Sequence, residues 1–127
     1  MSETAARTVL VVDDESDIRT LCKVNLEYEG YRVTEARGGT EALEMVQNDR
    51  PNVILLDLMM PGVDGWDVLE RLQSDDSTAK IPVILLTALA DEESQLRGWA
   101  EGILDYITKP FNPLSLPRYV ADALIEK

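Results

Sequence analysis

The sequence predicts an α/β protein in which a parallel sheet is covered by helices on both faces. Three short runs of Val, Ile and Leu, at residues 9–12, 53–56 and 83–86, are too short for helices and are typical of strands buried on both faces. Segments with a helical spacing of apolar residues separate these runs. Such alternation of strands and helices favours right-handed crossovers and a parallel sheet.

Two weaker candidates complete a set of five strands. Residues 31–36 alternate between apolar and polar side chains, and residues 105–108 directly precede Lys109 and Pro110. Each of the five strands is followed by a segment of helical period, so the expected element order is strand then helix, five times over.

Each of the five expected helices carries an apolar stripe. The stripes are formed by Ile18, Leu21, Cys22 and Leu26; by Ala42, Leu43 and Val46; by Val68, Leu69 and Leu72; by Leu96, Trp99 and Ala100; and by Leu116, Val120, Ala123 and Leu124. Gly30 is expected to end the first helix and Thr40 to cap the second. Pro117 is expected in the first turn of the fifth, where proline is tolerated.

Length and composition fit one globular domain over residues 1–127, with a core at about 8–125. The chain has 127 residues, of which 45% are hydrophobic and 28% charged. Twelve basic against 24 acidic residues leave a net charge of −12, which argues against direct binding to nucleic acid or to anionic lipid. The longest apolar runs have four residues and residues 1–7 lack a signal core, so we expect a cytoplasmic protein without a membrane span.

The absence of histidine and the single cysteine, Cys22, restrict the chemistry further. They exclude Ser-His-Asp and Cys-His mechanisms, histidine metal ligands, an intrachain disulfide and a cysteine-rich zinc site. Any chemistry must therefore depend on carboxylates, hydroxyls and lysines.

Polar residues follow the predicted strands at the points where those strands end. Asp13 and Asp14 follow the first strand and Asp57 the third, while Thr87 and Lys109 follow the fourth and fifth. In an open parallel sheet these ends lie along one edge, and ligands bind there. Singly, each residue has an ordinary structural interpretation, such as a turn or a helix cap; their joint placement favours a site.

Three carboxylates gathered at one place repel one another and therefore predict a bound cation. Because all available ligands are oxygen, the cation is expected to be Mg²⁺, with Mn²⁺ as a substitute. An acidic pocket with a metal, a lysine and a hydroxyl indicates phosphoryl transfer. Asp57 is the candidate nucleophile, with Lys109, Thr87 and the backbone N–H groups of Met59 and Ala88 holding the phosphoryl oxygens.

With these residues in place, the chain resembles the receiver domain of bacterial two-component response regulators, of the chemotaxis-regulator type. The resemblance extends from Thr8 to Ile125, and the stretches that carry it are 9–15, 55–66, 84–88 and 105–111. It implies a flavodoxin-like, doubly wound (βα)5 fold with a five-stranded sheet in the order 2-1-3-4-5.

The resemblance also implies roles for the site residues. Asp57 would accept a phosphoryl group from a phosphohistidine of a sensor histidine kinase or a histidine phosphotransfer protein. The implied Mg²⁺ ligands are Asp13, Asp14, Asp57 and the backbone carbonyl of Met59. Thr87 and Lys109 would engage the phosphoryl group. The peptide bond between Lys109 and Pro110 is expected to be cis.

The family further implies a switch rather than an enzyme: the domain catalyses only its own phosphorylation and dephosphorylation. Tyr106 and Thr87 would move together and change the surface of the fourth helix, fifth strand and fifth helix, to which an unidentified output protein or domain responds. Leu104 stands where the family usually has a charge, which favours a contact there, including a phosphorylation-dependent dimer.

Two other functions remain open at this point. One is an interaction module that keeps the fold but acts independently of phosphorylation. The other is a Mg²⁺-dependent phosphohydrolase, which usually needs a second acid near the nucleophile and a cap over the substrate. Met59 occupies the place two residues after Asp57, and the chain leaves no room for a cap.

Overall fold

The computed structural model describes residues 7–126, in which five strands alternate with five helices. The strands are β1 (Thr8–Val12), β2 (Arg32–Ala36), β3 (Val53–Leu56), β4 (Val83–Thr87) and β5 (Asp105–Thr108). The helices are α1 (Ser16–Tyr28), α2 (Gly39–Asn48), α3 (Gly65–Ser74), α4 (Glu92–Ala100) and α5 (Leu116–Glu126), with a 3-10 turn, η2 (Pro113–Ser115), before α5. The ends of the predicted domain, and with them most of the segment inspected for a signal core, lie outside the described residues.

All five strands are parallel and lie in the order β2-β1-β3-β4-β5, which confirms the predicted fold. In the sheet, β1 pairs with β2 on one side and with β3 on the other, so the chain order reverses at β1 and β3. Reversal of this kind opens a crevice at the carboxyl ends of the strands. The fold thus brings the ends of β1 and β3 side by side.

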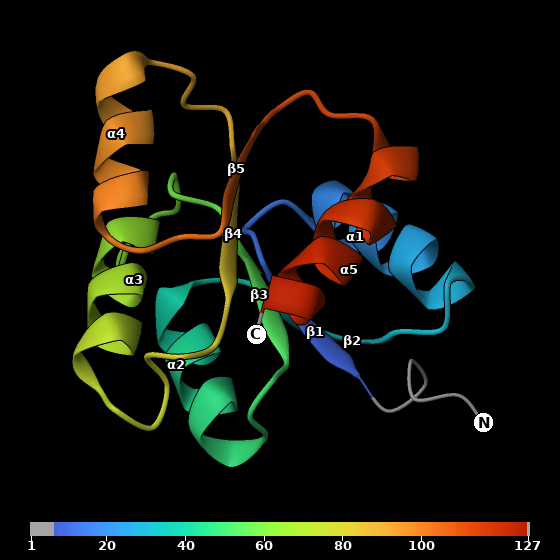
Figure 1. Ribbon diagram of the computed structural model, residues 1–127, viewed down its shortest axis with the longest axis horizontal. Coiled ribbons are helices and arrows are strands. Elements are labelled where there is room, and N and C mark those ends of the chain that lie inside the picture. Colours follow the sequence, from blue (N-terminus) through green and yellow to red (C-terminus); the bar gives the residue numbers. More distant parts are fainter. Residues whose placement is uncertain (1–6, 127) are drawn as a thin grey trace.

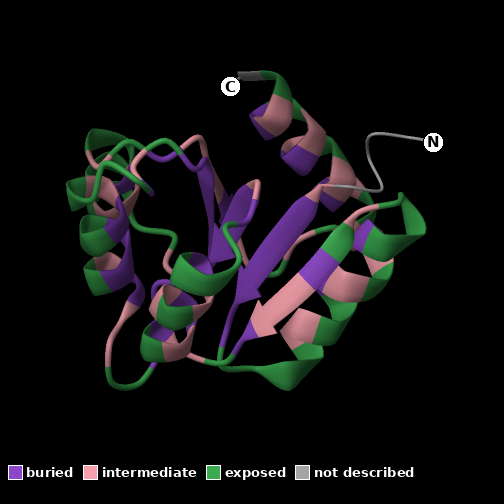
Figure 2. Ribbon diagram, turned by 90° about the horizontal axis from the view of Figure 1, so that it is seen from below, coloured by how far each residue is buried: buried purple, intermediate pink, exposed green. Residues whose placement is uncertain are grey.

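Helices α1 and α5 cover one face of the sheet, and α2, α3 and α4 cover the other (Figure 1). The central strands are buried, while the outer faces of the helices are exposed (Figure 2). Two apolar cores result, one on each face. The first includes Cys22 and Leu26 of α1 and Val120 of α5; the second includes Val46 of α2 and Leu69 of α3.

Most element boundaries agree with the sequence prediction, but the start of α2 does not. Thr40 does not cap this helix: α2 begins at Gly39, and Gly38 is its N-cap without a side-chain hydrogen bond. A Cβ atom at Gly39 would lie 2.5 Å from the carbonyl oxygen of Val63. Gly39 therefore lets the start of α2 pack closely against the loop before α3, a contact between segments that are distant in the sequence.

Helix α4 is attached to the rest of the molecule more loosely than its neighbours are. Its buried residue is Gly98, where a Cβ atom would lie 2.9 Å from Cδ1 of Ile103 and 3.1 Å from Cδ1 of Leu85. Leu96 and Trp99 of the same helix are exposed. The backbone at Gly98 is therefore the part of α4 that packs most closely on the sheet.

No helix within residues 7–126 combines the length and the apolar character needed to cross a bilayer.

The thiol of Cys22, on the buried side of α1, is completely buried. Burial raises the pKa of this thiol to about 12, with a smaller contribution from the charge of Asp13. Since the thiolate is the reactive form, Cys22 is expected to resist iodoacetamide at pH 8 in the folded protein and to react fully in 6 M guanidinium chloride. Mass spectrometry of the two samples measures this, and rapid labelling of the folded protein would contradict the burial.

Candidate functional site

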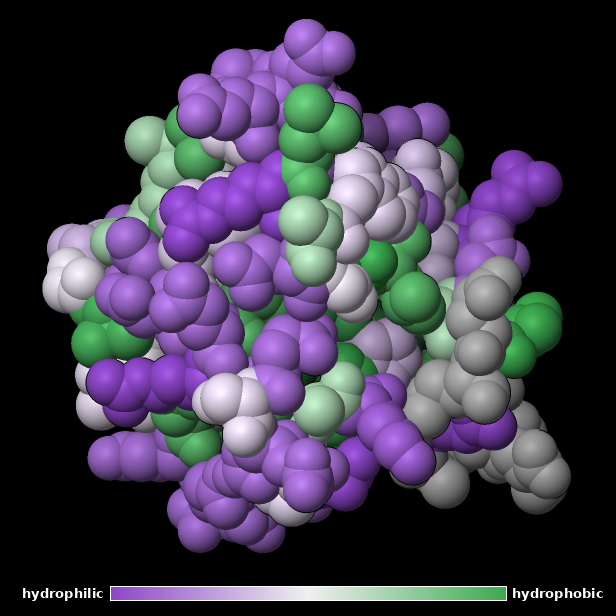
Figure 3. All heavy atoms as spheres, turned by 60° about the vertical axis from the view of Figure 1, so that its left-hand side comes forward, coloured by the Kyte–Doolittle hydropathy of each residue, from purple (hydrophilic) through white to green (hydrophobic). Residues whose placement is uncertain are grey.

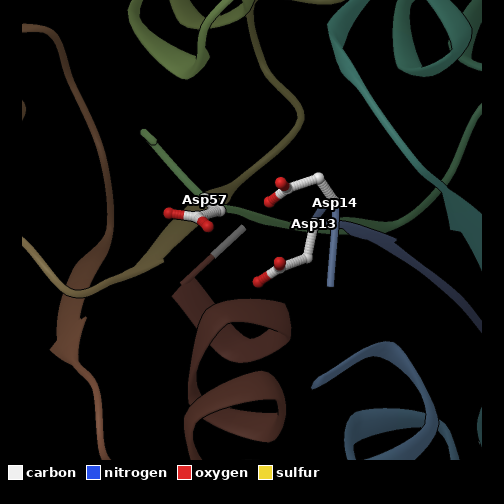
Figure 4. A group of neighbouring side chains, drawn as sticks. All are labelled: Asp13, Asp14 and Asp57. Atoms are coloured by element: carbon white, nitrogen blue, oxygen red, sulfur yellow. The ribbon is translucent and has the colours of Figure 1, made fainter. Parts of the chain in front are cut away.

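Three carboxylates converge at the carboxyl edge of the sheet. Asp13 and Asp14 follow β1, and Asp57 follows the neighbouring β3, where its backbone N–H donates to the carbonyl of Val12 at 3.0 Å. One oxygen from each carboxylate lies within 4.8 Å of the others, and the three side chains point toward a common space (Figure 4). Asp13 and Asp57 are buried, whereas Asp14 is exposed. The edge therefore concentrates negative charge at a place that solvent reaches from the Asp14 side.

Lys109, which follows β5, brings the positive charge to this cluster. Its Nζ atom lies 2.8 Å from Oδ2 of Asp13, 3.2 Å from Oδ2 of Asp57 and 3.3 Å from Oε1 of Glu15. The backbone N–H of Lys109 donates to the carbonyl of Thr87 at 2.8 Å, which fixes the end of β5 against the end of β4. The peptide bond that follows Lys109 is cis, the isomer that the resemblance implied.

The charges in the cluster shift the pKa values of its members. Burial opposes the charged form of Lys109, but the hydrogen bond that its ammonium group donates to Asp13 and the charges of Asp13 and Asp57 outweigh this effect and raise the pKa of the ammonium group. Burial also raises the pKa of Asp13, although hydrogen bonds from Lys109 and from the backbone of Glu15 act in the opposite direction. Lys109 is therefore positively charged throughout the physiological pH range.

Backbone N–H groups fix the orientation of the two buried carboxylates, and a side chain holds the backbone at Asp13. The N–H of Glu15 donates to Oδ1 of Asp13 at 2.9 Å, and the N–H of Met59 donates to Oδ1 of Asp57 at 3.0 Å. Arg19 donates to the backbone carbonyl of Asp13 at 2.8 Å. The sequence did not predict the contacts of Glu15 and Arg19; the acidic run 13–15 was the available signal for Glu15.

Gly65, the first residue of α3, has no side chain, and this leaves room for the backbone of the segment that follows β3. A Cβ atom here would lie 2.4 Å from the carbonyl oxygen of Asp57 and 2.6 Å from Cα of Leu58. The N–H of Gly65 donates to the carbonyl of Leu58 at 3.2 Å. The start of α3 is thus in direct contact with the backbone that carries Asp57.

Thr87 and Tyr106 are both near the end of β4, and the backbone of Leu89 lies between them. The hydroxyl of buried Thr87 accepts a hydrogen bond from the N–H of Leu89 at 3.3 Å, and the phenol of Tyr106 donates to the carbonyl of Leu89 at 2.7 Å. Ala88, between Thr87 and Leu89, is exposed. The two predicted switch residues are therefore linked through the polar groups of one intervening residue.

An open apolar basin of about 510 Å³ lies beside the carboxylates. Met59, Trp66 and Leu89 contribute to its lining. Arg97 of α4 lies over the indole ring of Trp66, with its guanidinium carbon 4.0 Å from the ring centroid, a cation–π contact between α4 and α3. Trp66 is consequently a natural fluorescence reporter for changes near Asp57.

The donor set fits a hard divalent cation. All the converging side-chain donors are carboxylate oxygens, and the carboxylates outnumber the single lysine that neutralises them. Oxygen donors of this kind suit Mg²⁺ or Mn²⁺. Its ligands would come from Asp13, Asp14 and Asp57, at the switch point of the sheet.

Comparison with known proteins agrees with the fold. Residues 9–121 match the model of the response regulator receiver domain, and the chain belongs to this family. Receiver domains are signalling modules of two-component systems rather than conventional enzymes.

Among curated proteins, the chain is 43% identical over 110 residues to the phosphate regulon transcriptional regulatory protein PhoB of Pseudomonas aeruginosa, covering 87% of the chain and 48% of the relative. It is 42% identical over 113 residues to the transcriptional regulatory protein ResD of Bacillus subtilis, covering 89% and 46%. The chain therefore spans about half the length of these relatives.

Among solved structures, the chemotaxis protein CheY4 of Vibrio cholerae is similar to the chain with a TM-score of 0.85 and 34% identity, over 93% of this chain and 98% of that one. The receiver domain of the Francisella response regulator 1452 gives a TM-score of 0.87 and 35% identity, over 94% and 98%.

Proposed function

We propose that this chain is the phosphoacceptor domain of a two-component pathway and that Asp57 receives the phosphoryl group. The observation that carries the proposal is the position of Asp57. Its carboxylate is buried at the switch point of the sheet, lies 3.2 Å from the ammonium group of Lys109, and shares a space with Asp13 and Asp14. A carboxylate held in this way is oriented for attack and unable to escape into solvent.

The donor is proposed to be a phosphohistidine of a separate protein, a sensor histidine kinase or a histidine phosphotransfer protein. An oxygen of Asp57 forms a bond to phosphorus while the bond between phosphorus and the imidazole nitrogen breaks. The imidazole leaves with the electron pair and takes a proton from water. The 127 residues contain no histidine, so a phosphohistidine donor lies outside them.

Four groups of the chain would then hold the phosphoryl oxygens. Lys109, whose ammonium group lies at the carboxylates, would pair with one oxygen, and the hydroxyl of Thr87, once released from the N–H of Leu89, would donate to another. The backbone N–H groups of Met59 and Ala88 are the proposed donors for the remaining charge. Donors that are already fixed by the fold stabilise charge that develops in the transition state, because they need no reorganisation.

The proposed metal ligands are Asp13, Asp14, Asp57 and the backbone carbonyl of Met59. When bound, Mg²⁺ or Mn²⁺ supplies positive charge that offsets the negative charge of the phosphoryl oxygens. The contribution of the chain is to hold the carboxylates together. Lys109 reduces their mutual repulsion, and the N–H of Glu15 fixes the orientation of Asp13.

The response to phosphorylation is proposed to be a shift between two arrangements of the surface formed by α4, β5 and α5. Movement of Thr87 toward a phosphoryl group requires its hydroxyl to leave the N–H of Leu89, and inward rotation of Tyr106 requires its phenol to leave the carbonyl of Leu89. Because both bonds end on Leu89, a displacement at Thr87 is passed directly to Tyr106.

The proposed setting is the bacterial cytoplasm, with an output protein or domain that reads the α4, β5 and α5 surface. The matched relatives PhoB and ResD are named as transcriptional regulators, so DNA binding by a further domain is compatible with the proposal. This domain itself is proposed not to contact nucleic acid, because its net charge is −12. Dimer formation on phosphorylation is a further proposed consequence of the switch.

A titration with beryllofluoride tests the proposal, because this group imitates a phosphoryl group on a carboxylate. With Mg²⁺ present, the fluorescence of Trp66 is expected to change with saturation, and Asp57→Asn is expected to abolish the change. Asp76→Asn serves as the control, since Asp76 is exposed in the loop after α3. To isolate the signal, Trp99 is replaced with phenylalanine in all samples.

Incorporation of phosphate from phosphoramidate, measured by intact-mass spectrometry, provides a second readout that does not depend on fluorescence. The wild-type chain and Asp76→Asn are expected to gain the mass of one phosphoryl group, and Asp57→Asn none. If the wild-type chain neither gains mass nor responds to beryllofluoride, it is an interaction module that acts without phosphorylation.

A further inference from the structure

The side chain of Arg19 in α1 is largely withdrawn from solvent although it carries a full positive charge. Hydrophilic side chains make up most of the face formed around α3 and α4, where water solvates them (Figure 3). The side chain of Arg19, by contrast, is only 12% exposed. Burying a charge is costly unless the charge is paired and hydrogen-bonded, so the contacts of this guanidinium group have to compensate for the water it has lost.

Two acceptors on different elements hold the guanidinium group of Arg19. Its Nη1 atom donates to the backbone carbonyl of Asp13 at 2.8 Å, and its Nε atom donates to Oε1 of Glu35 at 3.1 Å. Glu35 belongs to β2 and lies beside Val11 of β1 in the register of the two strands. Its second carboxylate oxygen lies 3.8 Å from the ammonium group of Lys23. Arg19 therefore joins α1 both to the end of β1 and to β2.

The carbonyl that Arg19 binds belongs to the peptide group that joins Asp13 to Asp14. Asp13 is only 1% exposed, and a buried backbone carbonyl needs a hydrogen-bond donor. β1 ends at Val12, and just beyond this residue the side chain of Arg19 supplies such a donor. Because a peptide group is planar, a carbonyl that is held in place also fixes the plane through which the chain continues to Asp14.

The carboxylate of Asp14 is held less firmly than that of Asp13. The N–H of Glu15 donates to Oδ1 of Asp13, and the ammonium group of Lys109 donates to Oδ2. The side chain of Asp14 is exposed, and no donor among residues 7–126 holds it. The position of Asp14 therefore depends on its backbone, which includes the peptide group that Arg19 binds.

We propose that Arg19, oriented by Glu35, is a positioning residue for the divalent cation. Its hydrogen bond to the peptide group between Asp13 and Asp14 keeps both carboxylates directed at the space that they share with Asp57 (Figure 4). Groups that orient metal ligands from outside contribute strongly to metal affinity. The proposal rests on the metal site of the proposed function and adds the residues of α1 and β2 that support this site.

Charge alone predicts the opposite effect of Arg19 on metal binding. A guanidinium group near a cation site repels the cation, so its removal would strengthen metal binding if charge were its whole effect. The carboxylate of Glu35, 3.1 Å from Nε of Arg19, offsets this repulsion. If Arg19 positions the ligands, its removal weakens metal binding instead. The direction of the change therefore separates positioning from charge.

Titration with Mn²⁺ tests the proposal, because the electron paramagnetic resonance signal of the free ion falls as the ion binds. This readout depends neither on phosphorylation nor on fluorescence. Arg19→Gln is expected to raise the Kd for Mn²⁺ about tenfold or more. Glu35→Ala is expected to raise the Kd by a smaller factor, because the guanidinium group loses its orientation. The double variant is expected to bind no more weakly than Arg19→Gln alone, since Glu35 acts through Arg19.

Arg37→Gln is the matched control for the loss of one positive charge. Arg37 follows β2 at the same edge of the sheet, its side chain is 77% exposed, and it lies 3.8 Å from Glu41. Because salt screens exposed charges, Arg37→Gln is expected to change the Kd for Mn²⁺ by less than about twofold. Circular dichroism melts in EDTA establish that each variant is folded at the temperature of the titration.

Unchanged or tighter binding of Mn²⁺ by folded Arg19→Gln would overturn the proposal. If Arg19→Gln does not fold, Glu35→Ala decides, and wild-type affinity of that variant would overturn it.

Asp14→Asn, measured in parallel, separates this proposal from the metal site on which it rests. If wild type binds Mn²⁺ and Asp14→Asn binds it more weakly, the metal site stands, and an unaffected Arg19→Gln refutes the positioning role alone. If wild type binds no Mn²⁺, or Asp14→Asn binds it as tightly as wild type does, both the metal site and the positioning role are refuted.

Discussion

Replacing Lys109 with methionine is expected to lower the free energy of unfolding by about 3 kcal/mol in metal-free buffer. The ammonium group of Lys109 lies 2.8 Å from Asp13 and 3.2 Å from Asp57, and both carboxylates are buried. Methionine has a similar length but no charge, so the variant leaves two buried carboxylates beside each other without a cation. Removing one partner of a buried charge cluster costs more than the cluster contributes as a whole, because the remaining charges stay desolvated.

Urea denaturation in EDTA measures this loss, with Lys80→Met as the control, since Lys80 is exposed. The pKa of Lys109 is raised above its ordinary value of 10.5, so its stabilising contribution is fully present below that pH and is lost only above it. Between pH 7 and 9 the deficit of the variant is therefore expected to be constant.

Lowering the pH is expected to reduce the deficit of the Lys109→Met variant, that is, the amount by which its free energy of unfolding falls below that of wild type. The hydrogen bond from Lys109 holds down the pKa of Asp13, which burial raises, so the variant should take up a proton at Asp13 more readily. Protonation removes one of the two unpaired charges, and the deficit should shrink as the pH falls from 7 toward 5. A deficit below about 0.5 kcal/mol at pH 8 would contradict the arrangement of the cluster.

Gly65→Ala is expected to destabilise the protein by about 1–3 kcal/mol and to disturb Asp57 as well. The added methyl group would lie 2.4 Å from the carbonyl oxygen of Asp57 and 2.6 Å from Cα of Leu58. Both neighbours are backbone atoms, so no side chain can rotate away, and either α3 or the segment carrying Asp57 must move. The beryllofluoride response of Trp66 is therefore expected to weaken at least tenfold.

Gly38→Ala is the matched control for this variant. A Cβ atom at Gly38 has no neighbour within 4 Å, and its φ of −168° is extended backbone that any residue adopts. Gly38→Ala is expected to leave both the urea midpoint and the beryllofluoride response close to those of wild type. Equal behaviour of the two variants would mean that the backbone contact at Gly65 is not tight.

The parts of the fold that the sequence predicted are those determined by local composition. The buried runs at β1, β3 and β4 consist of Val, Ile and Leu, and their shortness distinguishes them from the helices. The carboxyl-edge residues were predicted because the topology of a parallel sheet brings strand ends together. The structure places Asp13, Asp14, Asp57 and Lys109 in one cluster.

The features that the sequence did not reveal depend on contacts between distant segments. Thr40 resembles an N-cap, yet α2 starts at Gly39 because this backbone must approach Val63. The stacking of Arg97 on Trp66 joins helices that are separated by β4. Periodicity describes each helix by itself and carries no information about which side chains meet across the molecule.

Helix α4 buries little of its surface against the sheet, which bears on how easily it could change position. A helix that leaves the sheet surface gives up the apolar area it had buried, at about 25 cal/mol per Å², and α4 has one buried residue, a glycine without a side chain. Repositioning this helix would therefore cost little buried apolar area, as the proposed shift of the α4, β5 and α5 surface requires. Because Leu96 and Trp99 on its outer surface are exposed, substitutions there are expected to leave the two apolar cores intact.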